Sequence, residues 1–398
     1  MKLRKVYRFR MQATAAQQQQ LRFQAGARRW VWNWALARKV QHYQEHGQGL
    51  STNVLKAELP KLKAEPETAW LKEADSQSLQ ETLRDLDRAF VNFFERRARF
   101  PRFKSRKRNK PSFRISQRVA ISGGAVSVPK IGPIRIRQSQ PVRDKTKSAT
   151  FKQDAAGNWD VSLVSEFEMP DTPLVLADPL AVVGVDLGLK DFAVLSDGKR
   201  IPAPKFVRGR EGKLRRAQRA LSRRQARSNR RAKAKRVVAR IHARTANLRK
   251  DFVHQFTTGL VRKHEGICIE DLNSQALAKT KLGKSILDAA FGEVRRQLEY
   301  KTLWNRRHLA VIDRWFPSSK TCHACSAVND RLTLADRTWV CRCGVLHDRD
   351  FNAALNIRSE GLKLIPSRQD MRETLNARGL DVRLPRGAAE VEARIPRL

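Results

Sequence analysis

Three carboxylates stand at the ends of predicted elements, in positions where they could hold a metal ion. Asp186 follows the apolar run Val182–Val185, which is typical of a buried strand. Glu270 ends a second apolar run, Gly266–Ile269, and Asp350 opens a predicted helix. Each has an ordinary explanation when it is taken alone: a turn for Asp186, a strand terminus for Glu270 and a helix cap for Asp350. Taken singly, these acids predict no site.

Taken together in a strongly basic chain, the three acids predict a site for a hard metal ion. A carboxylate at a buried strand end is costly unless a cation pairs with it. Phosphodiester hydrolysis uses Mg²⁺ or Mn²⁺, and two such ions about 3.5–4 Å apart need carboxylates from separate elements. The sequence contains no phosphate-binding Gly-rich loop with Lys-Ser/Thr, no nucleophile elbow and no zinc-protease helix motif. No competing chemistry therefore stands out.

A second metal site is predicted by four cysteines in two close pairs separated by fifteen residues. The pairs are Cys322 and Cys325, then Cys341 and Cys343. Two thiol pairs on turns form a tetrahedral zinc site, and we place a hairpin in the fifteen residues between them. A full set of protein ligands implies structural zinc, with His323 and His347 as substitutes for a misplaced thiol. The alternative is four unrelated cysteines; Cys268, in a predicted strand, belongs to a core.

The charge of the chain predicts a polyanionic partner. Its 398 residues include 81 Lys and Arg against 39 Asp and Glu, a formal net charge of +42. Nucleic acid is the partner that such a balance favours, because Lys and Arg displace its counterions. An anionic membrane fits poorly, since the charge is spread along the chain and no apolar run approaches the roughly 20 residues of a membrane span. We expect a cytoplasmic, nucleoid-associated protein, and the clustered cysteines argue against a secreted disulfide framework.

Hydrophobic periodicity divides the chain into segments of different type. Residues 1–12 begin with a strand, 13–110 are mainly helical, and 111–178 contain short alternating strands that could close a small barrel with the first. Two further segments are basic. The alternative for both is solvated surface; we favour nucleic-acid contact for residues 96–110, where basic groups alternate with phenylalanines, and for residues 205–250, where carboxylates are nearly absent.

Four motifs begin at Gly184 (GVDLGLKDFA), Ile269 (IEDL), Phe316 (FPSSKTCHAC) and His347 (HDRDFNAALNI). They resemble those of the TnpB family, nucleases encoded by insertion sequences of the IS200/IS605 and IS607 groups and related to Cas12 effectors of type V CRISPR systems. The segment from Ala25 (AGARRWVWNWAL) also resembles the family's helical block. The resemblance covers nearly the whole chain. One departure is the second cysteine pair, which has one intervening residue where the family often has two.

The resemblance implies a multidomain α+β fold. It consists of a RuvC/RNase H-like α/β nuclease domain with a zinc-ribbon insertion, plus a β-barrel wedge domain with an inserted helical recognition domain. On this layout the wedge barrel is 1–12 and 111–178, and the recognition domain is 13–110. The nuclease domain is 179–315 and 348–363, the zinc-binding, target nucleic-acid-binding insertion is 316–347, and a C-terminal tail, for which disorder is expected, is 364–398.

The resemblance also implies the roles of the site residues. Asp186, Glu270 and Asp350 would be the catalytic triad holding two Mg²⁺, for which Mn²⁺ could substitute. Asp350 is preferred to Asp348 because the family's third carboxylate directly precedes its x-Asn-Ala-Ala helix. One structural Zn²⁺ would be bound by the four cysteines, Cys322, Cys325, Cys341 and Cys343.

The implied function is RNA-guided cleavage of DNA. The family binds a guide RNA transcribed from the transposon end, recognises a short motif beside the target in duplex DNA, forms an R-loop and cuts. Gln80 is a candidate reader of that motif, because an amide can bond bidentately to adenine; a plain surface glutamine is the alternative. Two other functions stay open, RNA-guided binding without cleavage and a DDE-type transposase. The oligomeric state is open too, with a monomer favoured.

Overall fold

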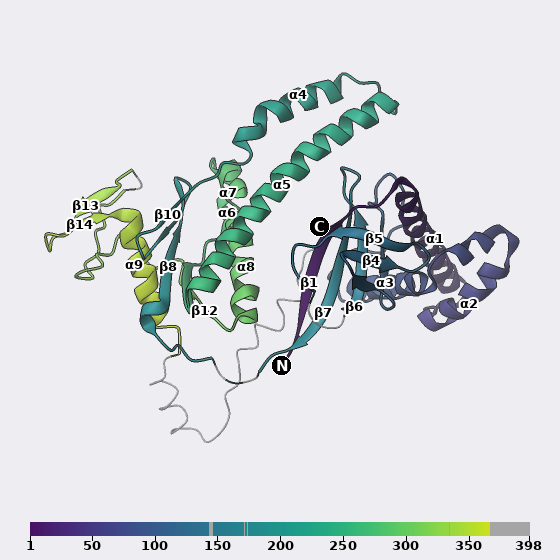
Figure 1. Ribbon diagram of the computed structural model, residues 1–398, viewed down its shortest axis with the longest axis horizontal. Helices are drawn as coiled ribbons and strands as arrows, with labels where there is room; N and C mark the ends of the chain where they lie inside the picture. The colour runs from purple at the N-terminus through teal and green to yellow at the C-terminus, as the bar shows by residue number, and fades with distance from the viewer. Residues whose placement is uncertain (143–145, 171, 173, 334, 367–398) are drawn as a thin grey trace. The chain divides into compact units, whose positions relative to one another are not determined.

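The computed structural model describes residues 1–142, 146–170, 172, 174–333 and 335–366. The described residues form two compact units, residues 1–170 and residues 172–366, and each is described by itself (Figure 1). Within the described residues no helix is long and apolar enough to cross a membrane. Of the tail expected at 364–398, residues 367–398 lie outside the described residues, whereas Ile365 is buried in the core of the second unit.

The first unit contains a seven-stranded sheet with the order β2-β6-β7-β1-β5-β4-β3. Its strands are β1 (Lys2–Met11), β2 (Ser112–Ile115), β3 (Ala120–Ser122), β4 (Ala125–Val128), β5 (Gly132–Arg137), β6 (Thr146–Gln153) and β7 (Trp159–Glu168). The N-terminal strand β1 is central because it pairs antiparallel with β7 along almost its whole length. On its other side it pairs with β5 only through Arg10 and Met11.

This sheet corrects the expectation of a closed barrel. No pairing joins the edge strands β2 and β3 in the part of the chain that the structure describes, so the sheet is an open half-barrel. The short β1–β5 contact accounts for the difference, because a junction of two residue pairs lets β3, β4 and β5 diverge from the rest. The hydrophobic side is closed instead by α1, whose Leu21 and Ala25 join the sheet's buried core.

The helical block between β1 and β2 consists of α1 (Ala15–His46), α2 (Thr52–Ala64), the 3-10 helix η1 (Pro66–Glu73) and α3 (Ser76–Phe94). A capping box starts α1, since Thr14 accepts from the backbone N–H of Gln17 and the Gln17 side chain accepts from that of Thr14. Gly47 ends the helix in the left-handed conformation that glycine favours. A separate core of buried leucines joins α1, α2, η1 and α3.

The second unit is built on a five-stranded sheet with the order β10-β9-β8-β11-β12. Its strands are β8 (Val182–Leu187), β9 (Asp191–Leu195), β10 (Arg200–Pro202), β11 (Gly266–Glu270) and β12 (His308–Ile312). The first three are antiparallel, whereas β8, β11 and β12 run parallel. The 3-10 helix η2 (Pro179–Ala181) precedes β8.

Helices cover both faces of this sheet (Figure 1). The long α5 (Asn229–Lys263) and α8 (Phe291–Trp304) pack on the face that carries Val183, Val185, Ile267 and Ile269. The final helix α9 (Arg349–Leu362) packs on the opposite face, where Ile357 meets Val182 and Cys268. Short helices η3 (Arg208–Arg210), α6 (Ser274–Leu277) and α7 (Gly283–Ala289) lie in the connections.

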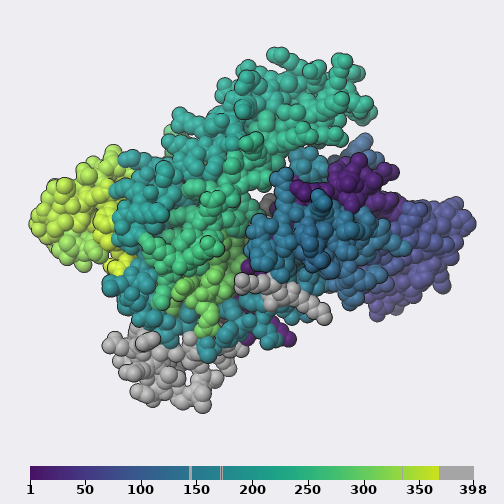
Figure 2. All heavy atoms as spheres, viewed as in Figure 1, coloured from purple at the N-terminus to yellow at the C-terminus, as the bar shows by residue number. Residues whose placement is uncertain are grey.

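A basic helical hairpin extends from this unit. It is formed by α4 (Glu211–Ser222) and α5, which run side by side beyond the sheet in Figures 1 and 2. No residue of α4 is buried. The basic segment at residues 205–250 is therefore mainly helical, and α5 continues past it to Lys263, because its C-terminal half joins the core through Val253 and Leu260.

The segment between β12 and α9 contains the four clustered cysteines and one small hairpin, β13 (Thr338–Val340) and β14 (Leu346–Asp348). The predicted place of the hairpin was wrong. It does not fill the fifteen residues between the cysteine pairs but surrounds the second pair, with Gly344 at φ +84° in its turn. Gly344 makes a tight turn possible, because glycine adopts positive φ at no steric cost. Such a turn agrees with the single residue between Cys341 and Cys343.

Candidate active site

Two of the three predicted carboxylates lie side by side on neighbouring parallel strands. Val185 of β8 is in register with Ile269 of β11, so Asp186 and Glu270 are the next residues along each strand. Because side chains alternate between the faces of a sheet, both carboxylates face the α9 side, opposite to Val185 and Ile269. The same alternation places Gly184 and Cys268 on that side.

Glycine allows α9 to approach this face closely enough to bring in the third carboxylate. A Cβ on Gly184 would lie 2.1 Å from the backbone oxygen of Ala354 and 2.7 Å from the backbone nitrogen of Arg358, both in α9. Farther along the helix, Gly361 packs against Cys268 in the same way. Asp350 stands in the first turn of this helix, so these contacts set its position relative to the strand ends.

The Asp186 carboxylate feels the charge of both other acids. Burial, followed by the charges of Glu270 and Asp350, raises the pKa of Asp186 to about 7. Among the described residues the Asp186 carboxylate has no hydrogen bond, and the charge of Arg349 only partly opposes the shift. A half-buried carboxylate that is repelled by two others is costly. A divalent cation would remove that cost, so this donor set fits Mg²⁺ or Mn²⁺.

Glu270 has one protein partner, Ser318, which the sequence did not indicate. The Ser318 hydroxyl donates to Oε1 of Glu270. Burial raises the pKa of Glu270, and this hydrogen bond acts in the opposite direction. Ser318 is in turn positioned by α9, because the side-chain amide of Asn356 donates to its backbone oxygen at 2.8 Å. The asparagines of the NAALN motif thus fasten the Ser318 turn to the helix that carries Asp350.

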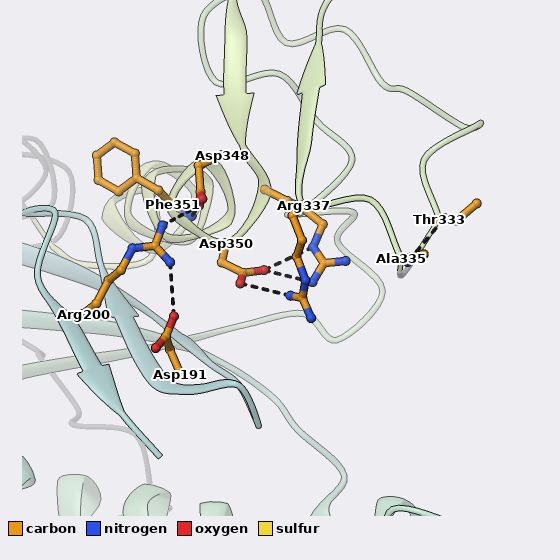
Figure 3. Close-up of polar contacts among 9 residues, drawn as sticks. Asp191, Arg200, Thr333, Ala335, Arg337, Asp348, Asp350 and Phe351 are labelled. Atoms are coloured by element: carbon orange, nitrogen blue, oxygen red, sulfur yellow. Dashed lines mark hydrogen bonds and ion pairs between the residues drawn. The ribbon is translucent and has the colours of Figure 1, made fainter. Parts of the chain in front are cut away.

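Asp350 is paired with two arginines (Figure 3). Arg337, which precedes β13, donates to its Oδ2 at 3.3 Å, and Arg349 donates to its Oδ1 at 2.9 Å. Asp348, the alternative third carboxylate, has a different role. It caps α9 by accepting from the backbone N–H of Phe351 and forms a 2.7 Å ion pair with Arg200. The cap that was the ordinary explanation for Asp350 therefore belongs to Asp348.

The oxygens of the three carboxylates are not yet close enough together to bind one metal ion jointly. Among the described residues, only the four cysteines place their ligand atoms within 4.8 Å of one another. The arginines explain this, since both oxygens of Asp350 are directed to guanidinium groups. Arg337 and Arg349 would have to release Asp350, at least in part, before its oxygens could share an ion with Asp186 and Glu270.

The four cysteines form the compact cluster that their spacing predicted. Sγ of Cys322 lies 3.7 Å from that of Cys343, and Sγ of Cys325 lies 3.5 Å from that of Cys341. Four thiols this close together are the donor set that a structural Zn²⁺ prefers, and zinc would bind them as thiolates.

The two histidines considered as substitute ligands differ. Nε2 of His347 lies 3.0 Å from Sγ of Cys322, whereas the His323 side chain is exposed. His347 also stacks on Trp339, with ring centroids 4.7 Å apart. It is therefore a hydrogen-bond partner of the thiol cluster. Cys268 is fully buried, and burial raises the pKa of its thiol to about 12, which agrees with the predicted core role.

Gln80, the candidate reader of a DNA motif, is exposed on α3. Its neighbours Gln77 and Gln117 bond to each other, since Nε2 of Gln77 donates to the Gln117 side chain at 3.0 Å. Arg118 forms an ion pair with the buried Asp75, which caps the same helix. The start of α3 and the β2–β3 loop thus present several polar groups around Gln80.

Metal-dependent enzymes that act on nucleic acids typically combine carboxylates at a sheet with basic surface helices. This chain has both, together with a separate thiol cluster. Comparison with family models agrees. One described as "Probable transposase" matches residues 166–281, and "Cas12f1-like, TNB domain" matches residues 291–357. A third, "Helix-turn-helix domain", matches residues 1–48.

Curated relatives match across nearly the whole chain. A protein of Streptomyces pristinaespiralis described as "Putative RNA-guided DNA endonuclease" is 39% identical over 365 residues, 90% of either chain. InsQ of Escherichia coli, described in the same words, is 34% identical over 380 residues, 91% of this chain and 93% of its own. A solved Cas12f1–sgRNA–target DNA complex aligns with a TM-score of 0.47 at 12% identity, over 90% of this chain and 99% of that one. The chain belongs to the TnpB family of RNA-guided DNA endonucleases, as the motifs predicted.

Proposed function

We propose that this chain cuts DNA under the direction of a guide RNA, using a two-metal site held by Asp186, Glu270 and Asp350. The observation that carries the proposal is the convergence of these acids: two stand on neighbouring strand ends and one on the helix packed above them. The sheet order supports a RuvC/RNase H-like domain. The antiparallel strands β10, β9 and β8 are followed by β11 and β12, which run parallel to β8, and Asp186 and Glu270 stand on the adjacent strands β8 and β11.

The three acids and their neighbours would have different roles in the reaction. Asp186, Glu270 and Asp350 would hold the metal, while Ser318 orients Glu270. The chemistry that Mg²⁺ would supply there is activation of a water molecule and stabilisation of charge on the scissile phosphate. Arg337 and Arg349 keep Asp350 paired until the site is loaded. A DNA strand entering the site offers its phosphates to both guanidiniums as an alternative partner.

The guide RNA and the target DNA would be bound mainly through their phosphates. The net charge of +42 supports this, as does the α4–α5 hairpin with its exposed arginines and lysines. In such enzymes base pairing with the guide reads the sequence, while the protein holds the backbone and reads only a short neighbouring motif. We propose the RNA transcribed from the transposon end as the guide, and Gln80 with its polar surroundings as part of the motif reader.

Binding without cleavage is the second candidate function. It would be favoured by the loss of an acid from the triad, and all three acids are present. A DDE-type transposase is disfavoured because the thiol cluster, placed between Glu270 and Asp350, and the family membership both point to a guided nuclease.

The direct experiment is to purify the full chain, sequence the RNA that co-purifies and use it to design a matching duplex target. We expect one defined RNA species and Mg²⁺-dependent cleavage of the matched duplex only. Asp186→Ala is the control and should bind the same RNA and target without cutting. Cleavage that does not depend on the RNA would contradict the proposal, and RNA-dependent binding with no cleavage by the wild-type chain would favour the second candidate.

A further inference from the structure

An aromatic pocket in the first unit has no role in the chemistry described above. It has a volume of about 320 Å³ and lies between α1 and η1. Its walls include three aromatic rings, Phe23, Trp30 and Trp70, and two polar side chains, Arg29 and Asn33. A volume near 300 Å³ is at the lower end of the range for small-ligand sites, and an apolar wall with a few polar groups is their usual composition.

The rings are arranged as a platform for a flat group. Trp70 stands edge-on to both Phe23 and Trp30, with ring centroids 5.9 Å apart in each pair. Trp30 is parallel to Trp34, one turn farther along α1, with an angle of 3° between the planes. All four rings are only half-buried. Large rings that are left partly open to solvent at a pocket can still cover the face of another planar group.

The polar groups give the pocket a positive edge. Among the described residues, no carboxylate pairs with Arg29, although its guanidinium lies over Gly26 inside the pocket. Asn33 joins the pocket to the basic linker at residues 96–110, because its amide donates to the backbone oxygen of Lys104 at 2.9 Å and its oxygen accepts from the Lys104 backbone N–H at 2.7 Å. Trp32 donates to the backbone oxygen of Arg102 at 3.0 Å.

The linker beside the pocket, residues 96–110, carries further aromatic and basic side chains. Nζ of Lys104 lies 3.1 Å from the centroid of the Trp32 ring. Phe103 is 62% exposed and Phe94, at the end of α3, is 73% exposed. Exposed aromatic rings interleaved with basic side chains are the combination that single-stranded nucleic acid prefers, since bases stack on the rings and phosphates meet the cations.

We infer that this pocket binds the base of an unpaired nucleotide, with Arg29 bonding to its phosphate or base edge. The inference rests on the proposed function and deepens it by assigning a nucleotide subsite to the helical block. Charge favours a nucleotide over an apolar ligand, because Arg29 needs an anionic or acceptor partner and the neighbouring linker is basic. The nucleotide could come from the guide RNA or from an unwound DNA strand, and the two sources share this chemistry.

Gly26 provides a test that fills the pocket without removing any of its walls. A Cβ at Gly26 would meet nothing nearer than the Arg29 guanidinium at 3.9 Å, so the larger side chain of Gly26→Leu enters open space. Leucine is also a better helix former than glycine, so α1 should not be weakened. We expect the full chain carrying Gly26→Leu to bind a fluorescent single-stranded oligonucleotide about 5- to 150-fold more weakly, the range for one lost base stack.

Gly49→Leu is the matched control, because Gly49 follows α1, is exposed and has open space around it. It should leave binding unchanged. Trp70→Ala should act like Gly26→Leu, and Trp70→Phe should restore most of the affinity.

Ultraviolet crosslinking and peptide mass spectrometry identify the source of the nucleotide. We expect adducts on the peptides that carry Trp30 and Trp70, with ribonucleotides if the base comes from the guide and deoxyribonucleotides if it comes from the target. Gly26→Leu should remove these adducts. A chain that binds RNA and cuts its target, yet shows the same affinity and the same adducts with Gly26→Leu, would overturn the pocket assignment alone. Failure to bind any nucleic acid would overturn the proposed function as well.

Discussion

A single methyl group at Gly184 should separate cleavage from nucleic-acid binding. Gly184 lies two residues before Asp186 on the same face of β8, at a point of close contact with α9. In Gly184→Ala, the new Cβ would stand 2.1 Å from the backbone oxygen of Ala354 and 2.8 Å from Cβ of Arg358. The obstacle is helix backbone, which cannot rotate away as a side chain would.

The size of the displacement follows from these distances. Real Cβ atoms essentially never lie closer than 3.0 Å to such a neighbour, so α9 must move by about 0.9 Å from 2.1 Å. Asp350 begins this helix and would move relative to the two acids on the strands. A misplacement of about 1 Å costs roughly 100-fold in rate, and overpacking of this kind costs about 1–3 kcal/mol of stability.

The assay is single-turnover cleavage of a guide-matched duplex, measured together with RNA content and target affinity. Gly184→Ala should cut roughly 100-fold more slowly, while RNA content and target affinity stay close to wild type. Gly259→Ala is the matched control, since a Cβ there meets nothing within 4 Å and alanine favours the helix; it should cut normally. Wild-type cleavage by a folded Gly184→Ala variant would refute the claim that this contact positions Asp350.

Three shorter predictions concern the metal sites. Asp186→Ala should abolish cleavage while RNA and target binding are kept; cutting at the wild-type rate would show that the metal site is assigned wrongly. Removal of zinc by a chelator should increase proteolysis within residues 316–347 without emptying the Mg²⁺ site, and an unchanged digestion pattern would contradict this. Arg337→Gln should lower the Mn²⁺ concentration needed for half-maximal binding by about two- to fivefold, the value of one partly exposed ion pair with Asp350; weaker Mn²⁺ binding would be the contrary result.

The parts of the fold and site that could be predicted are those encoded in short stretches of sequence. Short continuous apolar runs predicted the strands that carry Asp186 and Glu270, and the cysteine spacing predicted the thiol cluster. The family motifs predicted the membership that the comparisons confirm. The assignment of catalytic and metal-binding roles to the three acids, and of motif reading to Gln80, stays a prediction.

The parts that could not be predicted depend on contacts between distant segments. Ser318 bonds to Glu270 only because the turn that carries it is tied to Asn356, and an isolated serine has no periodic signal. The pairing of Arg337 with Asp350 joins the cysteine-bearing insertion to α9. The expectation of a closed barrel was wrong for a similar reason. Alternation of apolar and polar residues predicts strands, but it does not predict how many residue pairs join β1 to β5.

Divalent-ion stoichiometry tests the central claim most directly. The full chain, with its RNA and a matched target, would be titrated with Mn²⁺ and the bound ion counted by electron paramagnetic resonance. We predict two Mn²⁺ per complex in the wild-type chain and fewer in each of Asp186→Ala, Glu270→Ala and Asp350→Ala, whereas Asp348→Ala should keep both. Two ions retained in any of the first three variants would contradict a site shared by these carboxylates.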